Sequence, residues 1–128
     1  MEKIILRLER MRRVPPRFSW LDQRLLDPRN GWLEGLESGS LALYLILALA
    51  GDARGISFYS DRRLGALAAL PPAGLQKARR ELLAADLIAW KAPLYQVLSL
   101  PEKEAEKSLA EPVSSEQFTQ TLREAGVL

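Results

Sequence analysis

Residues 56–100 of this 128-residue chain read ISFYSDRRLGALAALPPAGLQKARRELLAADLIAWKAPLYQVLSL, and the order of elements in this stretch decides the fold. A short alternating stretch at 56–59 predicts a β-strand, with Ile56 and Phe58 on one face. Ser60 follows it, and serine is among the residues that most often cap a helix start. The spacing of the apolar residues that come next predicts two helices and a hairpin.

The apolar residues between 61 and 85 recur three and four positions apart, which predicts two short helices that each pack by one face. The break between them is Leu70-Pro71-Pro72-Ala73-Gly74, where a proline suits the first turn of the second helix. The expected inner faces are Leu64, Leu67 and Ala68 for the helix near 61–69, and Leu75, Ala78, Leu82 and Ala85 for the helix that ends near 85.

Two apolar runs, 87–91 and 94–100, follow these helices and lie only a few residues apart. Such a pair predicts a β-hairpin, here turning at Ala92-Pro93. Because Ala-Pro is not a pair typical of two-residue hairpin turns, we expect the turn to include Lys91 or Leu94 as well. The hairpin therefore directly follows the second helix.

Ten consecutive apolar residues, Leu41–Ala50, precede the stretch, and Ser40 is expected to cap the helix that they form. This helix is apolar all round, so we expect it to be buried on most sides. A membrane span requires about 20 such residues, and the run is too short for one. Because the charged N-terminus also lacks the apolar segment of a secretory signal, a cytoplasmic protein is expected.

From residue 41 to residue 100 the expected order is helix, strand, helix, turn, helix and hairpin, which resembles a winged helix-turn-helix domain. The residues that carry the resemblance are Leu64, Leu67 and Leu70 in the first helix of the motif, Leu75, Ala78 and Leu82 in the second, and Leu87-Ile88 entering the wing. Asp86 stands where many members of this class have glycine, and aspartate tolerates a left-handed backbone better than most residues. The resemblance implies a mainly α fold with a small antiparallel β-sheet (α+β).

The resemblance also implies a function, namely binding of double-stranded DNA with the recognition helix, about 72–85, in the major groove. Within the class, the chain looks most like the winged helices of plasmid and mobile-element replication initiators and of small bacterial transcriptional regulators. A role in transcription regulation or DNA replication is what this similarity implies.

A helical wheel shows what the recognition helix presents to DNA. Gln76, Lys77 and Arg80 fall opposite its apolar face, with no carboxylate among them. Gln76 suits adenine edges, whereas Lys77 and Arg80 suit guanine or phosphate. Arg79 lies at the margin of this face, where we expect it to contact a backbone phosphate. Glu81 lies on the other flank and is expected to pair with Lys77.

Three further cations complete the expected DNA surface. Arg62 and Arg63 lie in the first turn of the preceding helix, where free N–H groups and the helix dipole favour an anion. Two cations are unfavourable there for the helix alone, and a bound phosphate would relieve them. Tyr59 and Ser60 add hydrogen-bond donors at the same edge, and Lys91 is the one cation in the short wing.

The chain is expected to divide into a basic N-terminal arm with short helices (1–37), the winged core (38–100) and an acidic helical tail (101–128). Residues 1–100 contain 15 Lys or Arg against 10 Asp or Glu, whereas the remaining residues contain 3 against 6. A basic body favours an anionic partner, although a net charge of this size is also ordinary for a protein surface. The terminal helices or the helix at 41–50 are candidate surfaces for a homodimer.

The N-terminal arm contains one expected helix, Ser19–Leu26, which Ser19 caps. The aromatic residues are assigned to packing: Phe58, Trp90 and Tyr95 to the core or the wing, and Phe18, Trp20 and Trp32 to anchoring the arm on the body.

The composition excludes many chemistries, because the chain has neither cysteine nor histidine. Disulfides, thiolate and imidazole metal sites, cysteine nucleophiles and histidine triads are all excluded. Glycine-rich phosphate loops are absent, and the carboxylates are scattered among helix caps and ends. We therefore expect no enzyme, cofactor or metal. The alternative to DNA binding is a winged-helix module for protein interaction, which the short wing and the acidic tail favour.

Overall fold

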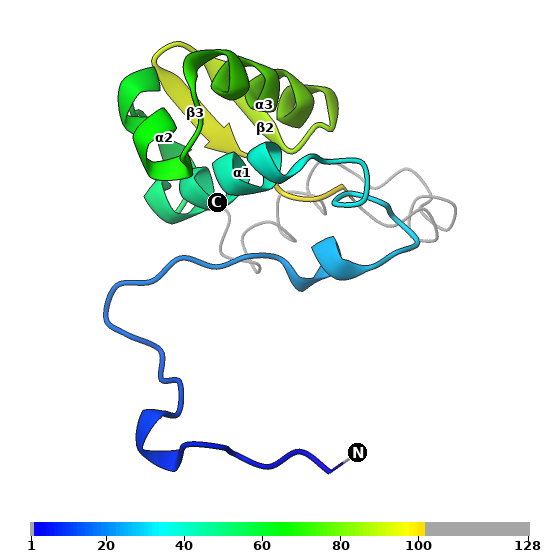
Figure 1. Cartoon of the computed structure of the whole chain (residues 1–128), viewed down its shortest axis with the longest axis vertical. Helices are drawn as coiled ribbons and strands as arrows, with labels where there is room; N and C mark the ends of the chain where they lie inside the picture. Colours follow the sequence, from blue (N-terminus) through cyan, green and yellow to red (C-terminus); the bar gives the residue numbers. More distant parts are fainter. Residues whose placement is uncertain (1, 102–128) are drawn as a thin grey trace, which may run out of the picture.

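The computed structural model describes residues 2–101, which form one body of helices and strands with an N-terminal segment running away from it (Figure 1). Its elements are the 3-10 turns η1 (Leu8–Arg10) and η2 (Gln23–Leu26), helix α1 (Ser38–Ala50), strand β1 (Ile56–Ser57), helices α2 (Asp61–Ala68) and α3 (Pro72–Ala84), and strands β2 (Ile88–Lys91) and β3 (Leu94–Val97). The expected α+β class is confirmed, and the order of elements is compatible with a winged-helix layout. Except for Pro101, the expected acidic tail lies outside the described residues.

The sheet is three-stranded and antiparallel, and β3 is its central strand. In the β2–β3 ladder, Trp90 pairs with Tyr95 and Lys91 pairs with Leu94. Two residues, Ala92-Pro93, therefore connect the strands, and the expected hairpin is confirmed. The expectation that its turn includes Lys91 or Leu94 was wrong, because these two residues pair with each other in the ladder.

The core lies where α1, α2, α3 and the sheet meet. Its large side chains are Leu43, Leu47, Leu64, Leu75, Leu82, Leu87, Ile88 and Tyr95, each no more than 2% exposed. The inner faces predicted for α2 and α3 are confirmed except at Leu67, which is 46% exposed. Burial of this apolar surface supplies most of the driving force for the fold.

Local signals read from the sequence decide several boundaries. Ser60 caps α2, since its Oγ accepts a hydrogen bond from the Arg63 N–H at 3.2 Å. Pro72 is the first residue of α3, where its missing N–H costs nothing. Asp86 has a φ of 59°, the left-handed backbone that its position before the hairpin suggested.

Helix α1 differs from the prediction in its start. It begins at Ser38 after the N-cap residue Glu37, whereas Ser40 lies inside the helix and is 1% exposed. The expected burial on most sides is confirmed, but one face, with Leu45 and Leu49, is exposed. An all-apolar helix shows no polar face, so its periodicity could not say which side packs on the core.

The assignment of Phe58 to packing in the core or the wing was also wrong. Phe58 follows β1 and is 69% exposed, whereas Ser57 is the buried residue of β1. Ser57 pairs with Tyr95, and directly opposite residues in a sheet share a face. Because Tyr95 faces the core, its partner Ser57 also faces the core, and the next residue, Phe58, is exposed.

The arm is less regular than predicted. Only the four residues of η2 are helical in the segment expected to form a helix, and Asp22 rather than Ser19 caps them by accepting from the Arg24 N–H at 2.9 Å. Trp32 packs against the core as predicted. Phe18 and Trp20 are 64% and 69% exposed, so their assignment as anchors was wrong. Within residues 2–101, no helix has the length and apolar character needed to cross a bilayer.

Candidate nucleic-acid interface

The side chain of Arg79 joins four elements of the fold. Its Nη1 donates to Asp61 Oδ1 at 2.8 Å and to the Tyr95 hydroxyl at 2.7 Å. Its Cζ lies 4.1 Å from the centroid of the Trp90 ring, and Trp90 in turn stacks on Tyr95 at 6.1 Å between centroids. Arg79 thereby ties the start of α2 and both strands of the hairpin to the middle of α3.

Burial and hydrogen bonding shift the pKa values of Arg79 and Tyr95, the two groups at the centre of this cluster, in opposite directions. Burial lowers the pKa of Arg79, but its hydrogen bonds to Asp61 and Tyr95 outweigh burial and raise the pKa overall. Burial raises the pKa of the Tyr95 phenol, and the bond from Arg79 opposes this shift only in part. At neutral pH the cluster therefore holds a charged guanidinium and a neutral phenol.

The expectation that Arg79 contacts phosphate from the surface was wrong as to its placement, because the residue is 7% exposed. Arg79 lies next to the apolar edge of the helical wheel, and the hairpin covers that edge. A usable signal was present in the sequence, since an arginine at a buried edge requires a carboxylate partner. Sequence reasoning missed Asp61 and Trp90 as those partners.

Arg62 and Arg63 are exposed at the start of α2, as predicted. Cζ of Arg63 lies 5.6 Å from the centroid of the Tyr59 ring, which orients this guanidinium by a cation–π contact. Within residues 2–101, the Arg62 side chain has no ion-pair or hydrogen-bond partner. Since Asp61 is held by Arg79, these two cations stand next to the middle of α3.

The outer face of α3 presents two of its three predicted contact residues freely. Gln76 and Arg80 are exposed, and Arg80 has no salt-bridge partner among the described residues. Lys77 is also exposed, but its Nζ lies 2.9 Å from Glu37 Oε1 at the N-cap of α1. That contact raises the pKa of Lys77.

The expected pairing of Lys77 with Glu81 is replaced by a contact between helices. Glu81 Oε1 accepts a hydrogen bond from the Glu37 N–H at 2.6 Å. The Lys77 and Glu81 side chains thus fasten α3 to the start of α1. A helical wheel contains one helix only and could not show this contact.

Lys91 ends β2 at the hairpin, where its side chain is exposed and has no ion-pair partner within the described part of the chain. It follows Trp90, whose ring lies against Arg79. The predicted site residues thus separate into an open cationic group (Arg62, Arg63, Arg80 and Lys91), the exposed amide of Gln76, the paired Lys77 and the buried Arg79. In residues 2–101, no cluster of three carboxylates is placed to hold a metal ion.

Comparison of the chain with protein-family models, with curated proteins and with solved structures finds no match.

Proposed function

We propose that this chain binds double-stranded DNA as a winged helix-turn-helix protein, with α3 in the major groove. The observation that carries the proposal is the placement of Arg79, which joins the start of α2 and both strands of the hairpin to the middle of α3. Each of these elements also carries an exposed cation: Arg62 and Arg63 on α2, Arg80 on α3 and Lys91 on the hairpin.

The exposed polar side chains are assigned either to base edges or to backbone phosphates of the DNA. Gln76 and Arg80 lie on the outer face of α3, and their amide and guanidinium groups suit adenine and guanine edges in the major groove. Arg62 and Arg63 lie at a helix N-terminus, where N–H groups and the dipole also favour a phosphate. Lys91 at the hairpin suits a second phosphate. Arg79 holds α2, α3 and the hairpin together and does not contact DNA in this proposal.

Salt-dependent binding to duplex DNA tests the proposal. Fluorescence anisotropy with a random-sequence duplex pool should show an affinity that falls steeply with salt. The three cations assigned to phosphates, Arg62, Arg63 and Lys91, predict at about −0.9 each a slope near −3 in a plot of log affinity against log salt concentration. Selection from the same pool would then yield the preferred sequence.

Variants identify the surface. Arg80→Ala should weaken binding about tenfold or more, and Arg62→Ala should reduce the salt slope by about 1. Arg29→Ala is the matched control, because Arg29 is an exposed arginine paired with Asp27 in the N-terminal segment. If the three variants bind as the parent does, the assignment of this face to DNA is wrong.

The second candidate is a protein-interaction module. Exposed Phe58, which follows β1, and exposed Leu94, at the hairpin, favour it, since apolar side chains are common at the centres of protein interfaces. This candidate predicts no salt-dependent affinity for duplexes, so the same titration separates the two functions.

A further inference from the structure

The N-terminal arm, here residues 2–18, carries apolar side chains that its own fold leaves in solvent. Those more than half exposed are Ile4, Ile5, Leu6, Leu8, Met11, Val14 and Phe18. Figure 1 shows this segment running away from the helices. A monomer surface rarely exposes so many large apolar groups together, and such sets commonly mark an interaction site.

A second apolar set lies on the outer side of α1. Leu41, Leu45 and Leu49 are four residues apart and therefore share one face of the helix. They are 38%, 45% and 59% exposed, whereas Leu43 and Leu47 on the inner side are 0% exposed. We call these three leucines the α1 stripe.

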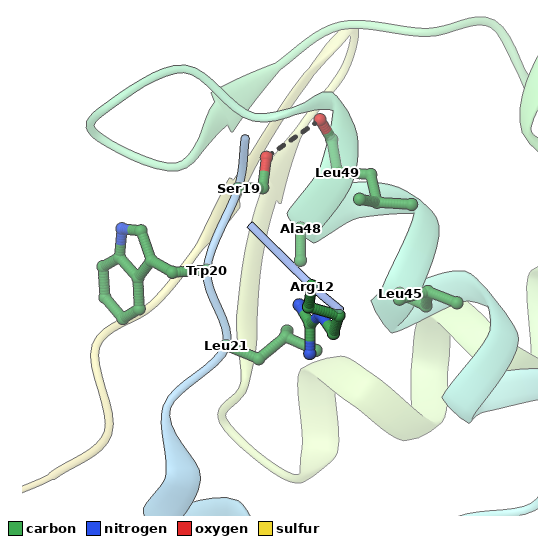
Figure 2. Close-up of a pocket in the computed structure, with 7 residues that line it drawn as sticks. All are labelled: Arg12, Ser19, Trp20, Leu21, Leu45, Ala48 and Leu49. Atoms are coloured by element: carbon green, nitrogen blue, oxygen red, sulfur yellow. Dashed lines mark hydrogen bonds between the residues drawn. The ribbon is translucent and has the colours of Figure 1, made fainter. Parts of the chain in front are cut away.

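Residues 19–21, which follow the arm, pass beside α1, and Leu45 and Leu49 of the α1 stripe remain exposed. Ser19 Oγ donates to the Leu49 carbonyl at 3.2 Å, and a hollow of about 410 Å³ remains between this segment and α1. Figure 2 shows Arg12 of the arm near Leu21 and Leu45. The chain's own arm thus brings one polar side chain to the hollow, whereas its large apolar side chains remain in solvent.

We infer that the α1 stripe is covered by the arm of a second copy of this chain, and that the exchange is reciprocal. Both apolar sets belong to the same chain, so one two-fold interface buries both sets in both copies. This inference does not depend on DNA binding.

The dimensions fit this occupant. An extended arm of 17 residues spans about 56 Å, and a helix of 13 residues about 20 Å, so the arm is long enough to follow the partner's α1. The ten side chains of the two sets, at about 60 to 120 Å² each, bring roughly 600 to 1,200 Å² of apolar surface per copy. A stable interface buries about 800 Å² per partner.

Light scattering on the full chain without DNA tests the inference. The expected mass is twice the 14.3 kDa of one chain. Leu45→Glu and, in the arm, Leu8→Glu should each return the mass to that of one chain. Leu67→Glu is the matched control, since Leu67 is 46% exposed on α2, and it should leave the dimer intact. A monomeric parent chain, or a dimer that survives both arm and stripe variants, overturns the inference.

Crosslinking separates exchange between copies from docking of the arm on its own α1. The chain lacks cysteine, so Leu8→Cys and Leu45→Cys can be made as two single variants and mixed under oxidising conditions. The expected product is a disulfide-linked heterodimer of the two variants. If the mixture gives none and the double variant instead closes a disulfide within a monomer, the arm lies on its own helix and the inference is wrong. Neither the light scattering nor the crosslinking uses DNA. A negative result in them would therefore not contradict DNA binding, and absence of DNA binding would not contradict the dimer.

Discussion

Arg79 and Trp90 form a cation–π contact in which the guanidinium carbon lies 4.1 Å from the centre of the indole ring. The contact joins the third helix to the first strand of the hairpin. Because Arg79 is 7% exposed, this cation is largely removed from water and depends on the protein for its hydrogen bonds. The arrangement makes the relative positions of helix and hairpin sensitive to one side chain.

Arg79→Ala should lower the free energy of unfolding by about 2–4 kcal/mol. The change removes the cation–π contact and leaves the buried Tyr95 hydroxyl without its donor. Urea denaturation followed by circular dichroism measures the loss. The neighbouring Arg80→Ala is the control and should stay within about 0.5 kcal/mol, since Arg80 is exposed and unpaired in the described part of the chain. Equal losses of unfolding free energy in the two variants would contradict the role of Arg79 in holding the third helix and the hairpin together.

Gly55→Ala should be strongly destabilising. Gly55 has a φ of +81°, and a Cβ there would lie 2.6 Å from the Val97 carbonyl oxygen. The carbonyl belongs to the backbone of the central strand, so it cannot move without disturbing the sheet. We expect a loss of about 2 kcal/mol or more in thermal or chemical unfolding. Gly35→Ala, where a Cβ meets nothing within 4 Å, should be tolerated, and a comparable loss there would refute the steric explanation.

Ser57→Ala should be neutral or stabilising. The Ser57 hydroxyl is buried without a hydrogen-bond partner in the described residues, so its removal relieves an uncompensated desolvation. Ser60→Ala is the same chemical change at the cap of α2 and should cost about 1 kcal/mol, because it frees the Arg63 N–H. Unfolding midpoints of the two variants should therefore move in different directions, or only the second should move. Marked destabilisation by Ser57→Ala would indicate a partner for its hydroxyl.

Tyr44 should make the fold sensitive to alkali. Burial raises its pKa above the ordinary value of 10.0, so the folded chain keeps the phenolic proton after the unfolded chain has lost it. The stabilisation from Tyr44 is thus fully present below pH 10 and is lost as the pH rises through the folded pKa. Tyr44→Phe should flatten the fall of unfolding free energy above pH 10. Parallel curves for the two proteins would show that Tyr44 does not contribute.

The sequence pattern predicted most of the fold, because most helix and strand boundaries depend on interactions between residues close together in the chain. The serine cap of the second helix, the proline that opens the third and the left-handed Asp86 each act within a few residues of the chain. The three- and four-residue spacing of Leu75, Ala78 and Leu82 similarly predicted core residues before any contact was known. These features require no knowledge of what packs against them.

The candidate site could be predicted only in part. The exposure of Arg80 followed from a helical wheel and that of Arg62 from its place in the first turn of a helix. The burial of Arg79 and the ion pair of Lys77 did not follow from either. Each of the latter two is decided by a carboxylate from another element, Asp61 for Arg79 and Glu37 for Lys77. A wheel describes one isolated helix and contains no neighbours.

The sequence by itself determined the order of helices and strands, the apolar faces of the second and third helices and the absence of thiol and imidazole chemistry. The tertiary structure alone decided which arginine is buried, which side of the all-apolar α1 stays in solvent and why Ser57 rather than Phe58 faces the core. The physical reason is the separation along the chain of the residues that interact. Caps, turns and periodicity depend on neighbours along the chain, but burial and ion pairing depend on residues such as Asp61 and Tyr95, which come within reach of Arg79 only when the elements pack.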